Sequence, residues 1–276
     1  MKKFGLIGYP LGHSMSGVIH KELFRISDMQ ADYELIQVDP EDLSDAFNNN
    51  LSKLNGFNVT IPHKINIIPF LDDLSDRAKL FGAVNTVHIK DNKAVGYNTD
   101  CHGFLRALDM ADIKLGGKVL LCGSGGVSRM FAFESALADA ELTIAVRDED
   151  LTAAAKIKQE IADKLGKDCR VEKLSCAGLG WDLIINGTPV GMYPNVDASP
   201  VSEKIVKSSK AVFDAVYNPK ETLFIKYAKQ AGIKYSNGLP MLVWQAAVAE
   251  EIWNDVEFSN SDIKDVIEIT QRELEE

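Results

Sequence analysis

The chain has 276 residues, of which 46% are apolar and 25% charged, and a formal net charge of −10 at pH 7. This length predicts a sizeable core divided between two domains, and the composition is that of an ordered globular protein. The negative charge argues against a broad surface for nucleic acid or anionic membrane, so we expect small-molecule partners, no nucleic acid and no membrane. No apolar run is long enough to act as a signal peptide or to cross a bilayer, which predicts a cytoplasmic protein.

The four cysteines show no C-x-x-C spacing. We therefore predict neither a zinc site nor a redox pair, and no metal in the protein. Reduced thiols, mostly packed in the core, are the expected state.

Strand-like and helix-like runs alternate in the first hundred residues. The expected strands are 4–9, 33–38 and 57–61, the expected helices are 20–26 and 42–48, and a hairpin joins 83–89 to 94–97. Such alternation predicts βαβ units with a parallel sheet. Residues 1–100 therefore form an α/β substrate domain in this interpretation.

The second half repeats this alternation around one glycine-rich turn. The expected strands are 119–122, 142–146, 170–173, 183–186 and 211–215, with helices at 152–165 and 221–231. This pattern predicts a doubly wound, Rossmann-like dinucleotide-binding domain over residues 101–237. Two further helices, 241–253 and 261–274, are expected to return to the first domain, which assigns 238–276 to it.

The glycine-rich turn lies between an expected strand and an expected helix. Gly123, Gly125 and Gly126 leave the backbone N–H groups open to a phosphate, and the following helix directs its positive end to the same place. Ser128 stands where this fingerprint usually has glycine or alanine. The turn predicts a site for a dinucleotide pyrophosphate, with a ligand-free glycine turn as the alternative.

Polar residues follow several expected strands, where open α/β sheets place their ligands. Ser14 and Ser16 follow the first strand and precede a helix, so they could hold a small carboxylate or simply cap that helix. Asn85 and Gln245 could reach a polyhydroxylated ligand or be satisfied core amides. The loop 186–192 is placed to face a nicotinamide.

Lys64 and Asp100 are the candidate proton-transfer pair. A lysine at the end of a buried strand can exchange a proton near neutral pH, and a buried aspartate needs a cation. Alternatively, Asp100 caps the helix that follows it. His63 is expected to face solvent or to cap a helix.

The order and separation of these motifs closely resemble the shikimate dehydrogenase family over essentially the whole chain. The segments that carry the resemblance are 12–16, 58–64, 82–86, 98–100, the glycine turn, 186–192, 216–219 and 241–245. Asn-Val-Thr-Ile-Pro-His-Lys and Gly-Ala-Val-Asn-Thr are the most specific of them.

The resemblance implies an enzyme that interconverts 3-dehydroshikimate and shikimate with NADP(H), in aromatic amino acid biosynthesis, as a monomer or homodimer. It implies Lys64 and Asp100 as the catalytic pair. The substrate-binding residues that it implies are Ser14, Ser16, Thr60, Asn85, Tyr217 and Gln245. The cofactor-binding residues that it implies are Gly123, Ser124, Gly125, Gly126, Val127, Arg147, Thr188, Gly238 and Met241.

The sequence departs from the family pattern where the cofactor's ribose is expected. NADP-using members commonly show Asn-Arg-Thr with another basic residue a few positions on, whereas here Arg147 is followed by three acidic residues, 148–150. An acidic residue at this point favours a free 2′-hydroxyl, so NAD stays open as the cofactor. Pro240 is a smaller departure. A quinate/shikimate dehydrogenase and a non-catalytic ligand sensor are the alternatives.

Overall fold

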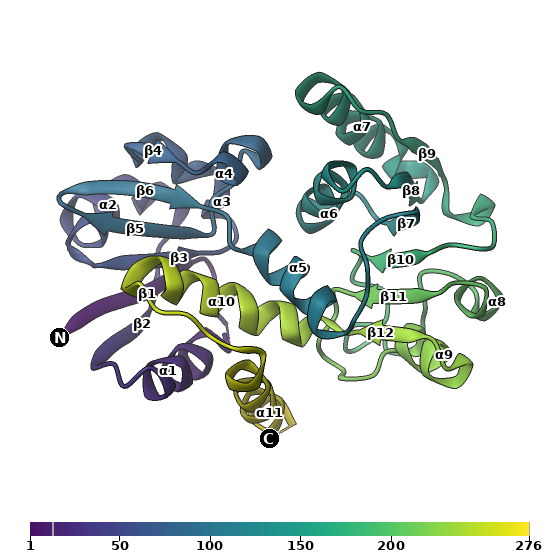
Figure 1. Ribbon diagram of the computed structural model, residues 1–276. Helices are drawn as coiled ribbons and strands as arrows, with labels where there is room; N and C mark the ends of the chain where they lie inside the picture. The colour runs from purple at the N-terminus through teal and green to yellow at the C-terminus, as the bar shows by residue number, and fades with distance from the viewer. Residues whose placement is uncertain (13, 276) are drawn as a thin grey trace. The chain divides into compact units, whose positions relative to one another are not determined.

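The structure is a computed structural model that describes residues 1–12 and 14–275. It divides into two compact units, one formed by Met1–Gly103 with Leu242–Glu276 and the other by Phe104–Met241. Each unit contains a six-stranded sheet covered by helices (Figure 1). The α/β class predicted from the sequence is confirmed.

The first unit has a mixed sheet in the order β2-β1-β3-β5-β6-β4. Its strands are β1 (Lys2–Gly8), β2 (Ala31–Gln37), β3 (Gly56–Val59), β4 (Asp73–Leu74), β5 (Thr86–Lys90) and β6 (Lys93–Tyr97). β1 pairs in parallel with β2 and β3, while β5 pairs antiparallel with β3 and β6. The parallel start and the hairpin are both as predicted, but the two-residue strand β4 was not anticipated.

Helices cover both faces of this sheet. They are α1 (Ser16–Ile26), α2 (Leu43–Asn49), α3 (His63–Asn66), α4 (Asp76–Phe81), the start of α5 (Asp100–Met110), most of α10 (Gly238–Asn254) and α11 (Asn260–Glu275). Ile7, Phe57 and Val87 belong to one buried cluster, and Phe4 belongs to another with Trp253 of α10. Alternate strand residues thus face opposite layers, which is the period of a sheet covered on both sides.

Helix α10 is fixed to the first unit by Trp253. The indole N–H donates to the Val87 carbonyl at 2.9 Å, and the ring stacks on Phe4 with centroids 4.7 Å apart. A Cβ on Gly56 would lie 2.3 Å from the indole nitrogen, so only glycine leaves room for this ring. The C-terminal helices therefore return to the first unit, as predicted.

The second unit has a fully parallel sheet in the order β12-β11-β10-β7-β8-β9. Its strands are β7 (Lys118–Cys122), β8 (Glu141–Val146), β9 (Arg170–Lys173), β10 (Leu183–Asn186), β11 (Ala211–Asp214) and β12 (Lys234–Ser236). This is the doubly wound order, with β7 and β10 side by side where the direction of winding reverses.

Apolar layers on both faces of the parallel sheet hold its helices in place. The helices are α6 (Gly126–Leu137), α7 (Leu151–Leu165), α8 (Glu203–Lys207) and α9 (Leu223–Ala231), with the remainder of α5. On one face Phe104, Phe131 and Phe213 form an aromatic cluster with centroids 4.5 to 5.6 Å apart. On the other, Val212 packs with Phe224 of α9.

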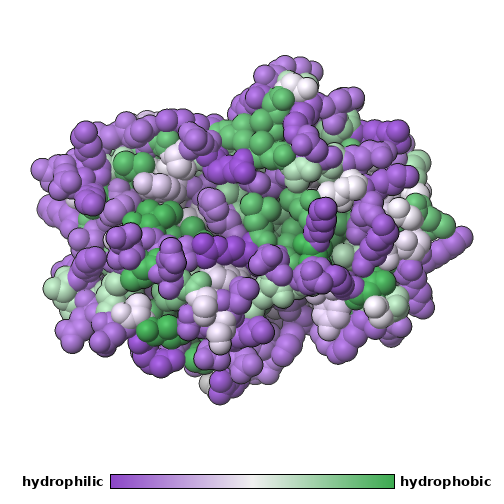
Figure 2. Space-filling model, viewed as in Figure 1, coloured by the Kyte–Doolittle hydropathy of each residue, from purple (hydrophilic) through white to green (hydrophobic). Residues whose placement is uncertain are grey.

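The face shown in Figure 2 is mostly hydrophilic, with hydrophobic residues gathered in smaller patches. Among the described residues, no helix combines the length and the apolar character needed to cross a membrane.

Candidate active site

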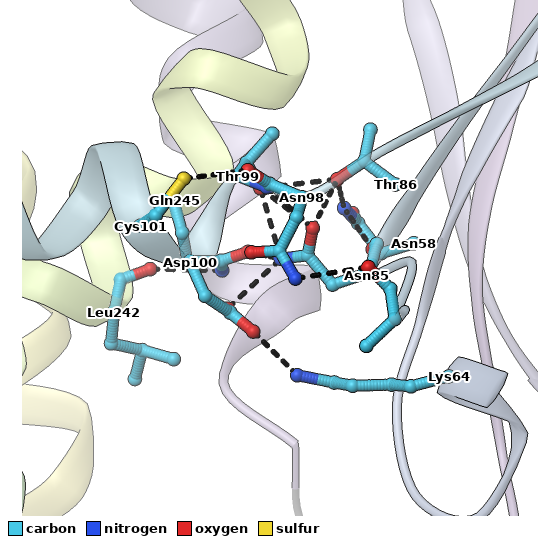
Figure 3. A network of polar contacts seen from close by, with 11 residues as sticks. Asn58, Lys64, Asn85, Thr86, Asn98, Thr99, Asp100, Cys101, Leu242 and Gln245 are labelled. Atoms are coloured by element: carbon cyan, nitrogen blue, oxygen red, sulfur yellow. Dashed lines mark hydrogen bonds and ion pairs between the residues drawn. The ribbon is translucent and has the colours of Figure 1, made fainter. Parts of the chain in front are cut away.

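Lys64 and Asp100 meet in the first unit although 36 positions separate them in the sequence (Figure 3). The turn after β3 places Lys64 in α3, and Asp100 is the first residue of α5. The lysine Nζ donates to Asp100 Oδ2 at 2.6 Å, with side-chain exposures of 33% and 22%. The pair is shielded enough for a strong interaction and still accessible to a ligand.

Asn85 holds the second oxygen of the same carboxylate. Its Nδ2 donates to Asp100 Oδ1 at 2.9 Å and lies 3.4 Å from Gln245 Oε1. Its Oδ1 accepts from the Thr99 backbone N–H at 2.6 Å, which fixes the orientation of the amide. Both oxygens of Asp100 are therefore oriented before any ligand arrives, while Gln245 is tied to α10 through the Leu242 carbonyl at 3.0 Å.

A second layer of buried polar groups supports Asn85 from behind (Figure 3). Asn58 Nδ2 donates to Thr86 Oγ1 at 3.0 Å, and Thr86 Oγ1 lies 3.1 Å from Thr99 Oγ1. Asn58 Oδ1 accepts from the Tyr33 hydroxyl at 2.7 Å. These groups satisfy one another inside the unit, so they act as a rigid support for the exposed pair.

Ser14 and Ser16 lie at the start of α1. Ser14 Oγ donates to Ser16 Oγ at 3.2 Å and accepts from the Ser16 backbone N–H at 3.3 Å. Both residues are half-buried. Two linked hydroxyls at the N-terminus of a helix can receive an anion such as a carboxylate. His13, which lies between the glycine and the first serine of this motif, is outside the described residues.

Thr60 follows β3, and its N–H donates to the Ile7 carbonyl of β1 at 2.9 Å. A Cβ on Gly8 would lie 2.5 Å from Thr60 Cγ2, so the glycine allows this close approach. Because β1 and β3 are parallel neighbours, Thr60 and the Ser14–Ser16 turn both follow the carboxyl ends of adjacent strands. Tyr217 lies in the second unit, after β11, and is an exposed residue.

The expectation for His63 is wrong. The ring is fully buried, and Nε2 lies 2.7 Å from the Val38 carbonyl oxygen. Pro62 is the N-cap of the short helix α3, and His63 is the first residue of that helix. In this position the His63 ring is buried in the core, while the next residue, Lys64, remains accessible.

The glycine turn of the second unit fits a pyrophosphate. Gly123 has φ +110°, a conformation that favours glycine, and Cβ atoms on Gly125 and Gly126 would meet nothing within 4 Å. The space beside their backbone is therefore open, next to the first N–H groups of the twelve-residue helix α6. Ser124 and Val127 flank these glycines and are half-buried.

Ser128 connects the glycine turn to the loop 186–192 through a hydrogen bond, which gives a structural reason for serine where the dinucleotide fingerprint usually has glycine or alanine. It is buried, and its Oγ donates to the Gly187 carbonyl at 2.9 Å. A Cβ on Gly187 would lie 2.3 Å from Ser128 Oγ, so glycine is needed for this contact. Thr188, next in the loop, donates from both N–H and Oγ1 to Asn186 Oδ1, at 3.0 and 2.6 Å.

Asp214 organises this same end of the sheet, and sequence reasoning missed it. Its carboxylate is buried and accepts from Thr222 Oγ1 at 2.6 Å, Asn186 Nδ2 at 2.9 Å and the Val216 N–H at 3.0 Å. Burial raises the pKa of Asp214 to about 6 despite these hydrogen bonds.

Of the remaining cofactor candidates, Gly238 has a packing reason of its own, because a Cβ there would lie 2.2 Å from the Ala215 carbonyl oxygen. Met241 is half-buried in α10, and Pro240 lies in the first turn of that helix, where proline is tolerated. Arg147 is exposed at the end of β8. Among the described residues no cluster of histidine, cysteine and carboxylate side chains is arranged to hold a metal.

Residues 6–87 match the family described as shikimate dehydrogenase substrate binding domain. A shikimate dehydrogenase (NADP(+)) from Methanocaldococcus jannaschii is 41% identical over 93% of this chain and 92% of its own length. The chain belongs to the shikimate dehydrogenase family. A crystal structure of shikimate dehydrogenase in complex with NADP+ superposes with a TM-score of 0.89 at 39% identity, over 98% of this chain and 95% of the other.

Members of similar fold need not share a substrate. The ligand-free 5-ketofructose reductase of Gluconobacter sp. strain CHM43 superposes with a TM-score of 0.86 at 31% identity, over 97% of this chain and 98% of the other. Family membership therefore leaves the substrate to be argued from the site.

The residues that support Asn85 and Asp100 from the interior were the ones that the sequence did not reveal. Thr86 and Thr99 were seen only as neighbours of the candidate residues, and the partnership of Asn58 with Tyr33 was not foreseen. The available signal was polarity inside short segments otherwise apolar enough to be buried.

Proposed function

We propose that this protein is a shikimate dehydrogenase that interconverts 3-dehydroshikimate and shikimate with NADP(H), in aromatic amino acid biosynthesis. The observation that carries the proposal is the 2.6 Å contact of Lys64 with Asp100, partly accessible in a unit whose residues 6–87 match the substrate-binding family. A sensor would have no chemical need for an ammonium held beside an oriented carboxylate.

The substrate carboxylate would be bound by Ser14, Ser16 and Thr60, which follow the ends of two adjacent strands. Asn85 and Gln245 would bind ring hydroxyls, since both amides already lie beside Asp100. This arrangement separates an anion-binding end from a hydroxyl-binding end, as a hydroxylated ring acid requires. A contribution from Tyr217 stays a prediction.

Lys64 would exchange the proton at the reacting oxygen. In reduction, a hydride adds to the carbonyl carbon, the π electrons move to the oxygen, and that oxygen takes a proton from the Lys64 ammonium. In oxidation the same proton returns to a neutral lysine. Asp100 would keep Nζ at the reacting oxygen through its hydrogen bond with the ammonium, and no metal is needed for this step.

NADPH, when bound, supplies the hydride. Gly125 and Gly126 leave open backbone beside α6 for its pyrophosphate, and Arg147 would contact its 2′-phosphate. Ser124, Val127, Thr188, Gly238 and Met241 stay predictions as further contacts, and so do the cytoplasmic location and the monomeric or homodimeric state.

A spectrophotometric assay that crosses shikimate and quinate with NADP+ and NAD+ tests this function. We expect the highest kcat/KM for shikimate with NADP+. The highest value for quinate with NAD+ would identify a quinate/shikimate dehydrogenase instead, and no turnover of either acid would favour a sensor.

The similarity to 5-ketofructose reductase supports a second candidate, reduction of a neutral hydroxyketone. The linked serines discriminate between the two, because an anion-binding turn contributes nothing to a neutral substrate. Assay of 5-ketofructose with NADPH should show little turnover in the wild type. If it exceeds shikimate turnover and is insensitive to Ser16→Ala, the second candidate is correct.

A further inference from the structure

The end of β8 carries a compact group of charges in the second unit. Arg147 follows this strand, and its guanidinium pairs with Asp150 at 2.8 and 2.9 Å and with Glu149 at 3.1 Å. Both carboxylates belong to the turn that leads directly into α7. The guanidinium fork is thus already engaged by carboxylates of its own loop.

A second cation reaches the same turn from the neighbouring strand. Lys173 ends β9, and the parallel register places it opposite Val146, the residue before Arg147. Its Nζ lies 2.7 Å from Asp148 Oδ2. A second basic side chain is therefore present beside the turn, although it comes from another strand and not from the residues after Arg147.

These two cations lie where a doubly wound fold places the adenosine ribose. The pyrophosphate turn follows β7, β8 is the adjacent strand, and the ribose 2′ position is recognised at the end of that adjacent strand. A 2′-phosphate presents several oxygens and about two negative charges, and it suits a guanidinium and an ammonium together.

We propose that Lys173 is, with Arg147, a determinant of NADP specificity. In the absence of cofactor Asp150 pairs with Arg147 and Asp148 pairs with Lys173, and the 2′-phosphate displaces these two carboxylates when it binds. This inference rests on the proposed function. Binding is then an exchange of one anion for another, and the 2′-phosphate contributes only the difference between the two sets of ion pairs.

The exchange predicts opposite effects for the two kinds of charge. Removing a cation weakens binding of the 2′-phosphate, whereas removing a carboxylate strengthens it, because less must be displaced. NAD+ lacks this phosphate and leaves the carboxylates paired with the two cations rather than with its 2′-hydroxyl, so its affinity should respond to neither change. A merely structural role for the turn would affect both cofactors alike.

Isothermal titration of the full-length protein with 2′,5′-ADP and with 5′-AMP isolates the phosphate. We expect Lys173→Gln to weaken 2′,5′-ADP about tenfold, and Asp148→Asn and Asp150→Asn to strengthen it about threefold, with 5′-AMP unchanged. Titrations of NADP+ and NAD+ should give the same pattern, and rising salt should weaken 2′,5′-ADP more than 5′-AMP.

The exposed ion pair of Lys158 with Asp168, 3.0 Å long, provides matched controls in the same unit. Lys158→Gln and Asp168→Asn should change neither affinity. If wild type and Lys173→Gln bind 2′,5′-ADP with equal affinity, or if Lys173→Gln loses the same affinity for 2′,5′-ADP and for 5′-AMP, the inference is wrong while the proposed function stands. A wild type that binds neither probe nor cofactor would overturn the proposed function with it.

Discussion

Two carboxylates, Asp100 in the first unit and Asp214 in the second, lie at or shortly after the end of a strand and organise the loops around them, yet their surroundings differ in charge. Asp100 is paired with the ammonium of Lys64. The hydrogen-bond donors to Asp214 are a hydroxyl, an amide and a backbone N–H, all neutral. A cation partner distinguishes a carboxylate that can serve proton transfer from one that fastens a loop, and exposure follows the same division, because Asp214 is fully buried.

The largest expected effect is on the Lys64 side of this comparison. Lys64→Ala should lower kcat about a thousandfold, because the reacting oxygen loses its proton donor, while KM for shikimate changes little. Steady-state kinetics with shikimate and NADP+ measure both constants. Lys79→Ala, which removes an exposed ion pair with Asp73 in the same unit, is the matched control. Unchanged kcat in the Lys64 variant would remove it from the mechanism.

Asp100→Asn sharpens the comparison by removing charge while keeping shape. We expect kcat to fall about a hundredfold, since Lys64 loses the anion that positions its ammonium. Asp73→Asn serves as the control, and a kcat of the Asp100 variant as high as that of this control would contradict the expectation.

Asp214 should report on stability rather than on chemistry. Its pKa is raised to about 6 in the folded protein, so between about pH 4 and 6 the unfolded chain ionises this group while the folded chain keeps its proton. Its contribution to the free energy of unfolding is therefore present at low pH and declines by roughly 2–3 kcal/mol as pH rises through this window.

Urea unfolding of wild type and Asp214→Asn at several pH values measures that contribution. Subtracting the free energies of unfolding of the two proteins removes the contributions of other carboxylates. Asp73 is one of these, and its lowered pKa makes stability rise with pH instead of fall. The variant should lack the decline. Parallel pH dependence in both proteins would show that Asp214 does not titrate in this range.

The smallest effect is expected at the anion-binding end. Ser14→Ala and Ser16→Ala should each raise KM for shikimate about tenfold, with a smaller effect on kcat, because a hydrogen bond to a charged group contributes about 1.5 kcal/mol. Ser202→Ala, at the start of α8, is the control. A fall in kcat with unchanged KM would place these hydroxyls nearer the chemistry than we propose.

The sequence predicted elements and the meeting of two distant residues better than it predicted burial. Lys64 and Asp100 could be paired in advance because both follow buried strands and a buried aspartate needs a cation. His63 could not be placed, since adjacent residues in a short helix face different ways and only the packing around Val38 decides which enters the core. Asp214 was missed because its three partners come from separate segments.

Ion pairs between residues on neighbouring strands could not be predicted from the sequence either. The three residues after Arg147 are all acidic, whereas the ammonium of Lys173 is brought beside the turn by the pairing of β8 with β9. Register between strands is set by their packing faces, and no local pattern near residue 147 contains it.

The boundaries between the two units fall inside helices. Residues 100–103 of α5 belong to one unit and the rest of that helix to the other, and α10 is divided in the same way after Met241. Asp100 lies on α5 and Gln245 lies on α10, so each belongs to a helix that both units share. Chimaeras that swap one unit between relatives must therefore carry α5 and α10 whole, because a junction placed at either boundary would join part of a helix from one relative to the rest of it from another.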